Sequence, residues 1–266
     1  MYFPMRPMRP VLQPVAPVKV TARMEIDGEI HEVRYGPGED FESPSDFFPP
    51  CKATLRLPCQ AMLNLVQSSG LLEELPLDAT KTLHVALPFC GSMQELLVLT
   101  DFFSRQVLGH RVNKIAILGS DLYDWNLKGG YWKQKELHIR RRQPGIDVRF
   151  CQLDLATFQH PPASLMFAIH PECTVQVDLW RKILSNIISA CVGLCVVVTF
   201  SEDEAKVVSG VGQALHRRCQ VHQNPYYQNS TNSSAGSAGS AGPAGAPLPP
   251  FMKFIVLLST QTPPGG

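Results

Sequence analysis

The chain has 266 residues, of which 44% are hydrophobic, and a formal net charge of +1. This length and composition suit one large α/β domain with extensions and supply enough apolar side chains for a core. The near-neutral charge gives no electrostatic reason to expect a nucleic acid or an acidic membrane surface as a partner. The sequence contains no run of about 18 apolar residues, so we do not expect a transmembrane helix.

The eight cysteines do not have the spacing of a zinc site. The nearest two, Cys191 and Cys195, flank the start of a predicted strand and have no histidine partners in the sequence around them. Cys90, Cys151 and Cys195 lie within apolar runs, where a cysteine acts as a small buried hydrophobic residue. We therefore expect reduced thiols, no bound metal and an intracellular, cytoplasmic protein.

Residues 1–23 contain five prolines and no acidic residue. Regularly spaced prolines prevent a helix and favour an extended arm. A lack of acids is also a feature of organelle transit peptides, but those peptides are amphipathic and rich in serine, and this arm is neither. Organelle targeting by the N-terminal arm therefore stays an alternative to the cytoplasm.

Residues 24–36 predict a β-hairpin that turns at Asp27-Gly28, a dipeptide typical of two-residue hairpin loops. Residues 37–58 form a proline-rich connector, whose aromatic side chains we expect to pack over a cleft as a lid. The apolar residues of 60–75 recur on one side of a predicted helix, and Gly70 weakens its end.

Residues 83–121 are the most informative part of the sequence. In this stretch a strand, a small-residue turn, a helix, a second strand and an acid follow one another. The first apolar run ends at Pro88, and the turn Cys90-Gly91-Ser92 follows at once. Residues 93–108 carry apolar side chains at helical spacing, and the next apolar run closes on Asp121. This order is the first half of a nucleotide-binding α/β unit. Its turn can bind a polar or anionic ligand, and its acid can accept hydrogen bonds from ribose hydroxyls.

The rest of the chain alternates between helices and strands. Residues 123–143 predict a polar helical stretch interrupted at Gly129-Gly130. Its basic end, residues 138–142, is interpreted as a solvated helix face rather than an RNA-binding patch, because nothing else in the sequence extends the positive charge. The further predicted strands are 146–155, 163–169 and 193–200, and the further predicted helices are 177–191 and one that runs from Ser201, its N-cap, to about 215.

The last two predicted strands, 218–228 and 251–259, are joined by a low-complexity segment instead of a helix. Residues 229–250 repeat Ser-Ala-Gly and offer no side chains that could build a core, so we expect this segment to be disordered. A flexible loop favours an antiparallel strand pair. Because 251–259 is apolar on both faces, we expect it inside the sheet, between the fifth strand and 218–228.

Five strands that alternate with helices, followed by a final strand pair, resemble the class I S-adenosylmethionine-dependent methyltransferases over about residues 60–260. The resemblance implies an α/β, Rossmann-like, seven-stranded and mostly parallel sheet, with an antiparallel last strand and helices on both faces. In that family the first strand ends in Asp-x-Gly-x-Gly-x-Gly. Here Pro88-Phe89-Cys90-Gly91-Ser92-Met93 keeps the Cys-Gly step but lacks the leading acid and two glycines. We divide the chain into an extension (1–57), a methyltransferase-like domain (58–260) and a tail (261–266).

The resemblance also implies S-adenosylmethionine as the cofactor. In the family, the acid after the second strand holds the ribose hydroxyls, a role that falls to Asp121, and the acid after the third strand lies near the adenine amino group, a role that falls to Asp154. The residues that the resemblance implies as cofactor-binding are Phe89, Cys90, Gly91, Asp121, Leu122, Asp154 and Leu155.

Each of these residues also has a purely structural explanation. Gly91 can form a tight turn without a ligand, and Asp121 or Asp154 can cap the segment that follows it. Tyr123 and Trp125 can stack on adenine or contact a sulfonium cation, or they can pack in the core.

His170-Pro171-Glu172 follows the fourth strand, where the family places residues that face the methyl acceptor. We therefore take His170 and Glu172 as candidate catalytic residues, with His170 as a proton acceptor, although a polar loop residue is the alternative. The tripeptide is not the Asn-Pro-Pro-Tyr signature of enzymes that methylate nucleic-acid amino groups, so the unidentified acceptor is expected to be a small molecule or a protein. Methyl transfer needs an aligned nucleophile and sometimes a base, but neither a covalent enzyme nucleophile nor a metal.

Two other functions compete with a methyltransferase. A catalytically inactive methyltransferase-like binding or scaffold protein is favoured by the departures at Phe89 and Met93, whereas the retention of Asp121 and Asp154 favours the enzyme. A nicotinamide-dependent oxidoreductase is disfavoured by the missing Gly-x-Gly-x-x-Gly and by the terminal strand pair.

Overall fold

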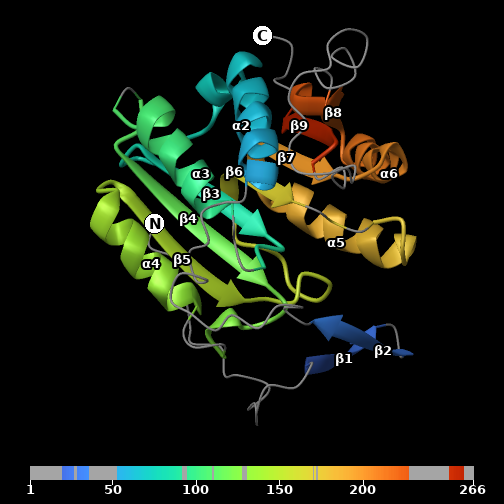
Figure 1. The fold of residues 1–266 in the computed structure, drawn as a ribbon. Helices are drawn as coiled ribbons and strands as arrows, with labels where there is room; N and C mark the ends of the chain where they lie inside the picture. Colours follow the sequence, from blue (N-terminus) through green and yellow to red (C-terminus); the bar gives the residue numbers. More distant parts are fainter. Residues whose placement is uncertain are drawn as a thin grey trace, which may run out of the picture.

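The computed structural model describes residues 20–26, 29–35, 53–91, 95–109, 111–127, 131–169, 171, 173–227 and 252–260. Seven strands in this part of the chain form one sheet in the order β5-β4-β3-β6-β7-β9-β8, with helices on both faces (Figure 1). The strands are β3 (Thr82–Pro88), β4 (Lys114–Asp121), β5 (Ile146–Gln152), β6 (Ala163–Ile169), β7 (Cys191–Thr199), β8 (Arg217–Gln223) and β9 (Phe254–Thr260).

The pairing of the strands confirms the predicted fold class. Strands β3 to β7 run parallel to one another, and β9 is antiparallel to both of its neighbours. Strand β9 lies between β7, the fifth predicted strand, and β8, which precedes the low-complexity segment. This confirms its expected place. Residues 255–258 of β9 are all buried, as a strand that is covered on both faces requires.

Two hydrophobic clusters, one on each face of the sheet, hold the layers together. The first contains residues of α2 (Ala53–Ser68), α3 (Leu96–Phe102) and α4 (Tyr131–Arg142), and the second contains residues of α5 (Val177–Ala190) and α6 (Glu202–Ala214). Successive strand residues contribute to opposite clusters: Val196 of β7 lies in the first and Val197 in the second. This alternation follows from the two-residue period of a strand.

The start of α6 confirms the predicted N-cap. The Ser201 hydroxyl accepts a hydrogen bond from the Glu204 N–H (3.2 Å), and a Glu204 carboxylate oxygen accepts in return from the Ser201 N–H (3.0 Å). This reciprocal capping box satisfies two backbone donors that the first helical turn leaves without a partner.

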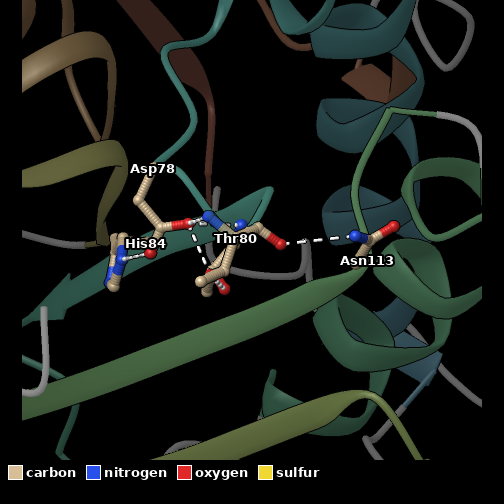
Figure 2. A network of polar contacts seen from close by, with 5 residues as sticks. Asp78, Thr80, His84 and Asn113 are labelled. Atoms are coloured by element: carbon tan, nitrogen blue, oxygen red, sulfur yellow. Dashed lines mark hydrogen bonds and ion pairs between the residues drawn. The ribbon is translucent and has the colours of Figure 1, made fainter.

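A polar network at the amino end of β3 fixes the entry of the chain into the sheet (Figure 2). One carboxylate oxygen of Asp78 accepts from the N–H groups of Thr80 and Thr82, each at 2.8 Å, and from the Thr80 hydroxyl at 2.7 Å. The other oxygen contacts Nε2 of His84 at 3.0 Å. Asn113, just before β4, donates from its amide to the Thr80 carbonyl (3.3 Å) and thereby links the two parallel strands at their amino ends.

The first helix of the domain begins earlier than predicted. Helix α2 starts at Ala53 and contains Pro58, whereas the sequence interpretation assigned residues 37–58 to a connector and began the helix at residue 60. Pro58 is the sixth residue of α2, past the first turn, so its missing N–H removes one i→i−4 hydrogen bond of the helix. The helix ends at Ser68, because Gly70 adopts a φ of 74° and a short 3₁₀ turn, η1 (Leu71–Glu74), follows. The rest of the connector, with its expected lid, lies outside the described residues.

Several other boundaries shift by a few residues. Strand β5 ends at Gln152 and β8 at Gln223, both earlier than predicted, while α3 continues as a π-helical turn, η2 (Phe103–Val107). The predicted hairpin is present as β1 (Val20–Ile26) and β2 (Glu29–Tyr35), which pair antiparallel. Within the described ranges, no helix is both long and apolar enough to cross a membrane.

Candidate functional site

The predicted site residues gather at the carboxyl edge of the sheet, where β3, β4 and β5 end side by side. The turn Phe89-Cys90-Gly91 follows β3, Asp121 closes β4, and Asp154 comes two residues after β5. Ligands of open α/β sheets bind outside this edge. The candidate cofactor-binding residues are therefore on the edge at which such a ligand would bind.

Asp121 and Gly91 are joined directly. The Gly91 N–H donates to a carboxylate oxygen of Asp121 (2.8 Å), and the Cys90 N–H donates to the Ser120 carbonyl (3.0 Å). On its other side, the Gly91 carbonyl accepts from the indole N–H of Trp132 in α4 (3.2 Å). Gly91 has a φ of 49°, a conformation that glycine adopts without steric cost. The turn after β3 is thus held by the end of β4 and by α4.

The Asp121 side chain is only 8% exposed. Burial raises the pKa of this carboxyl, and the N–H groups of Tyr123 and Gly91, which donate to the ionised form, act in the opposite direction. The second carboxylate oxygen accepts from the Tyr123 N–H (3.0 Å). The Trp125 side chain and the Leu122 N–H also stabilise the ionised form. A carboxylate accepts about four hydrogen bonds, so a ribose hydroxyl would have to replace one of these donors.

Phe89 occupies a position that a glycine would fill more easily. Its φ is 58°, in the left-handed region, which costs a residue with a side chain about 1–2 kcal/mol. Its ring packs edge-to-face against Trp180 of α5, with 5.2 Å between centroids. This contact with α5 holds Phe89 in place and points its side chain to the second cluster of the core.

Aromatic side chains surround the Gly91 turn. Tyr123 is buried and packs edge-to-face against Trp125 of η3 (Trp125–Leu127), with 5.5 Å between centroids. The Trp125 ring lies 4.0 Å from the point where a β-carbon on Gly91 would stand. Trp132 stacks on Phe150 of β5 at 5.4 Å. Tyr123 and Trp132 therefore belong to the core, and Trp125 lies against the turn.

Sequence reasoning missed the buried face of α4. Trp132 and Ile139 are 1% and 0% exposed, and Lys135 between them is 2% exposed, although the stretch has a polar composition. The spacing of 132, 135 and 139 is the signal that could have identified this face.

Burial lowers the pKa of Lys135 to about 7, while Glu95 and Cys90 nearby oppose this shift. Burial, with Asp121 close by, raises the pKa of the Cys90 thiol, so Cys90 is not an activated nucleophile.

Asp154 is engaged by the turn that follows it. Its carboxylate oxygens accept from the Ala156 N–H (2.9 Å) and from the Thr157 hydroxyl (2.7 Å). This is the turn-residue arrangement that the sequence left open as an alternative to adenine binding. Leu155 is buried, and its carbonyl accepts from Asn186 of α5 (2.9 Å).

Leu122, the residue after Asp121, is partly exposed. Its carbonyl accepts from the side-chain amide of Gln152 at the end of β5 (2.9 Å). This bond ties together the carboxyl ends of β4 and β5, close to the candidate site.

The two candidate catalytic residues, His170 and Glu172, lie outside the described residues. The strand that they follow, β6, ends at Ile169, and the intervening Pro171 is buried. Their role at the acceptor side stays a prediction. Among the side chains that are described, no three histidine, cysteine or acidic groups are arranged to hold a metal ion.

No protein-family model matches this sequence, and no curated protein matches it. Chains of known structure with a similar fold include magnesium protoporphyrin IX methyltransferase from Synechocystis PCC 6803 with bound S-adenosylmethionine. The identity is 12%, the TM-score is 0.46, and the match covers 85% of this chain and 88% of that one.

Two further similar structures come from other organisms. Precorrin-6y C5,15-methyltransferase from Geobacter metallireducens GS-15 has 12% identity and a TM-score of 0.43, and the match covers 77% of this chain and 87% of that one. Geranyl diphosphate C-methyltransferase from Streptomyces coelicolor A3(2) has 11% identity and a TM-score of 0.42, with coverages of 83% and 85%. These identities and TM-scores are too low to indicate a function. The strand order and the residues at the carboxyl edge of the sheet are what indicate one.

Proposed function

We propose that this protein is an S-adenosylmethionine-dependent methyltransferase that acts on a small-molecule or protein acceptor. The observation that carries the proposal is the hydrogen bond of 2.8 Å between the Gly91 N–H and the Asp121 carboxylate. It joins the turn after β3 to the acid at the end of β4, in a sheet whose strand order ends with an antiparallel strand between two others. The resemblance to class I methyltransferases predicts this strand order and the acid at the end of β4.

The residues at this edge have distinct tasks under the proposal. Asp121 accepts hydrogen bonds from the ribose hydroxyls, while Gly91 allows the ligand to approach the backbone closely. When bound, S-adenosylmethionine supplies an electrophilic methyl carbon. His170 and Glu172, which directly follow β6 in the sequence, are proposed to face the acceptor, with His170 taking up a proton as the acceptor reacts. We also propose a cytoplasmic location, because the seven described cysteines are all free thiols.

The alternative is a catalytically inactive binding or scaffold protein. Both carboxylate oxygens of Asp121 already accept from backbone N–H groups, and the side chain is 8% exposed. Under this alternative, Asp121 serves to fix the Gly91 turn, and Asp154 serves to cap the turn after β5. The two functions therefore differ in whether the edge binds the cofactor.

Calorimetric titration with S-adenosylhomocysteine and, separately, with NAD distinguishes these functions. We expect saturable binding of S-adenosylhomocysteine and none of NAD. The Asp121→Ala variant should bind at least about tenfold more weakly, because a hydrogen bond to a charged group contributes about 1.5–3 kcal/mol. The matched control is Asp178→Ala, which removes an acid whose side chain is 96% exposed on α5. Unchanged affinity in a folded Asp121→Ala protein would rule out the ribose role.

The acceptor side requires a second experiment, once a substrate is found. His170→Ala should lower the turnover number and leave the affinity for S-adenosylhomocysteine nearly intact. A loss of cofactor affinity instead would assign His170 to the cofactor side, and unchanged turnover would remove it from the reaction.

A further inference from the structure

A group of cations lies beside the first half of β4 and β5, away from the candidate cofactor site at the carboxyl ends of these strands. Lys114 begins β4, Arg149 lies in β5, and Arg140 comes from the last turn of α4. Together with Gln143, Gly145 and Asp147 they line a cleft of ≈ 430 Å³, which we term the basic cleft. The cleft is shallow and widely open to solvent.

The three cations converge on a single carboxylate. The distances from Asp147 are 3.9 Å to Lys114, 3.8 Å to Arg140 and 3.7 Å to Arg149. These are longer than the roughly 2.7–2.9 Å of a charge-assisted hydrogen bond. The side chains of Lys114, Arg140 and Arg149 are 49%, 59% and 49% exposed. All three cations therefore lie around Asp147, but none of them is at the distance of a short hydrogen bond to it.

The positive charge exceeds the nearby negative charge. The lining of the basic cleft holds three cations, and Arg141 and Arg142 are exposed nearby on the last turn of α4. The lining holds one acid, Asp147. Two further acids lie close by: Glu136 accepts from the Phe150 N–H (2.9 Å), and Asp101 accepts from the Gln143 side-chain amide (3.0 Å). The three cations and one acid of the lining give a local charge of +2, whereas the whole chain carries only +1. The carboxyl end of α4 stabilises cations at this place.

The fold leaves this part of the sheet open. Residues 153–162, which connect β5 with β6, form turns but no helix. In the edge strand β5, Ile146, Val148 and Phe150 are buried against the first cluster, and Asp147 and Arg149 alternate with them on the other face. The helices of that other face, α5 and α6, contact β7, β8 and β9. Arg149 thus lies on an exposed edge of the sheet.

We propose that the basic cleft binds the phosphate groups of a small di- or polyphosphate ligand. Guanidinium groups present paired N–H donors that match phosphate oxygens, and a lysine ammonium adds a mobile point charge. Because all three cations lie within 3.9 Å of one carboxylate, the cleft suits one or two phosphates better than an extended nucleic-acid backbone. The competing explanation is that charges on an edge strand only prevent pairing with another sheet.

Calorimetric titration of the full chain with inorganic pyrophosphate at low salt tests the proposal. We expect saturable binding with one site, weakened about fivefold to tenfold in Arg149→Gln and in Arg140→Gln. Asp147→Asn should bind pyrophosphate more tightly than the unmodified chain, because the competing carboxylate is gone. The matched control, Arg181→Gln, removes an equally exposed arginine from α5 and should leave the affinity unchanged.

The opposite results would overturn the proposal. These are an absence of saturable pyrophosphate binding, equal affinities of Arg149→Gln and Arg181→Gln, or binding of a ten-nucleotide RNA without binding of pyrophosphate. Because Arg140, Asp147 and Arg149 are not among the residues at the carboxyl edge, the variants should bind S-adenosylhomocysteine as the unmodified chain does. Failure of one site is therefore distinguishable from failure of the other.

Discussion

Replacement of Asp78 by asparagine should destabilise the domain in a pH-dependent way. The carboxylate of Asp78 accepts from two N–H groups and a hydroxyl of Thr80 and Thr82 and contacts His84 (Figure 2). The amide of Asp78→Asn has nearly the same shape, but it lacks the charge and one of the two acceptor oxygens. An acceptor that holds turn N–H groups contributes about 1 kcal/mol, and a hydrogen bond to a charged group contributes somewhat more.

Solvent reduces these contributions, because the Asp78 side chain is 23% exposed. Water can therefore accept some of the hydrogen bonds that the carboxylate accepts in the unmodified protein. We therefore expect Asp78→Asn to lower the free energy of unfolding by about 2 kcal/mol at pH 7. The measurement is urea unfolding followed by circular dichroism. The matched control is Asp178→Asn, whose side chain is 96% exposed and which should change the free energy by less than about 0.5 kcal/mol.

The pH dependence separates this mechanism from a general loss of packing. The hydroxyl of Thr80 and the N–H of Thr82 hold the pKa of Asp78 far below its ordinary value of 3.8. For a depressed pKa, the stabilisation is fully present above the unfolded-state value and is lost as the pH falls toward the folded-state value. The difference between the two proteins should therefore narrow as the pH falls below about 4. A difference below about 0.5 kcal/mol at pH 7, or one that is the same at pH 7 and pH 2, would refute the reasoning.

Helix α6 supplies further predictions, all measured by the same unfolding assay. Gly210→Ala meets no atom within 4 Å and should stabilise the protein by about 0.5–1 kcal/mol, whereas Gly212→Ala would place its β-carbon 2.5 Å from Leu258 and should destabilise it by about 1–3 kcal/mol. Equal effects of the two substitutions would contradict the packing of α6 on β9. Ser201→Ala removes the N-cap acceptor and should cost about 1 kcal/mol, and an unchanged free energy of unfolding would show that the capping box does not stabilise the helix.

Local patterns in the sequence were sufficient for most of the fold. The strands β4 and β6 have the predicted bounds, because an apolar run between turn residues is a short-range signal. The interior position of β9 followed from its apolar residues on both faces. The positions of Gly91 and Asp121 at the ends of neighbouring strands followed from the order of the elements along the chain. The start of α2 was wrong, since Pro58 suggested a connector and the helix contains it.

Contacts between distant residues were decided only by the tertiary structure. The bond from Gly91 to Asp121 spans 30 residues of sequence, and the bond from Trp132 to Gly91 spans 41. In the same way, Lys114 and Arg149 extend the basic end of α4, which the sequence alone gave no reason to expect. Residue types and their period determine which face of a helix or strand is buried. The pairing of side chains across elements depends on strand register and helix placement, which no local pattern contains.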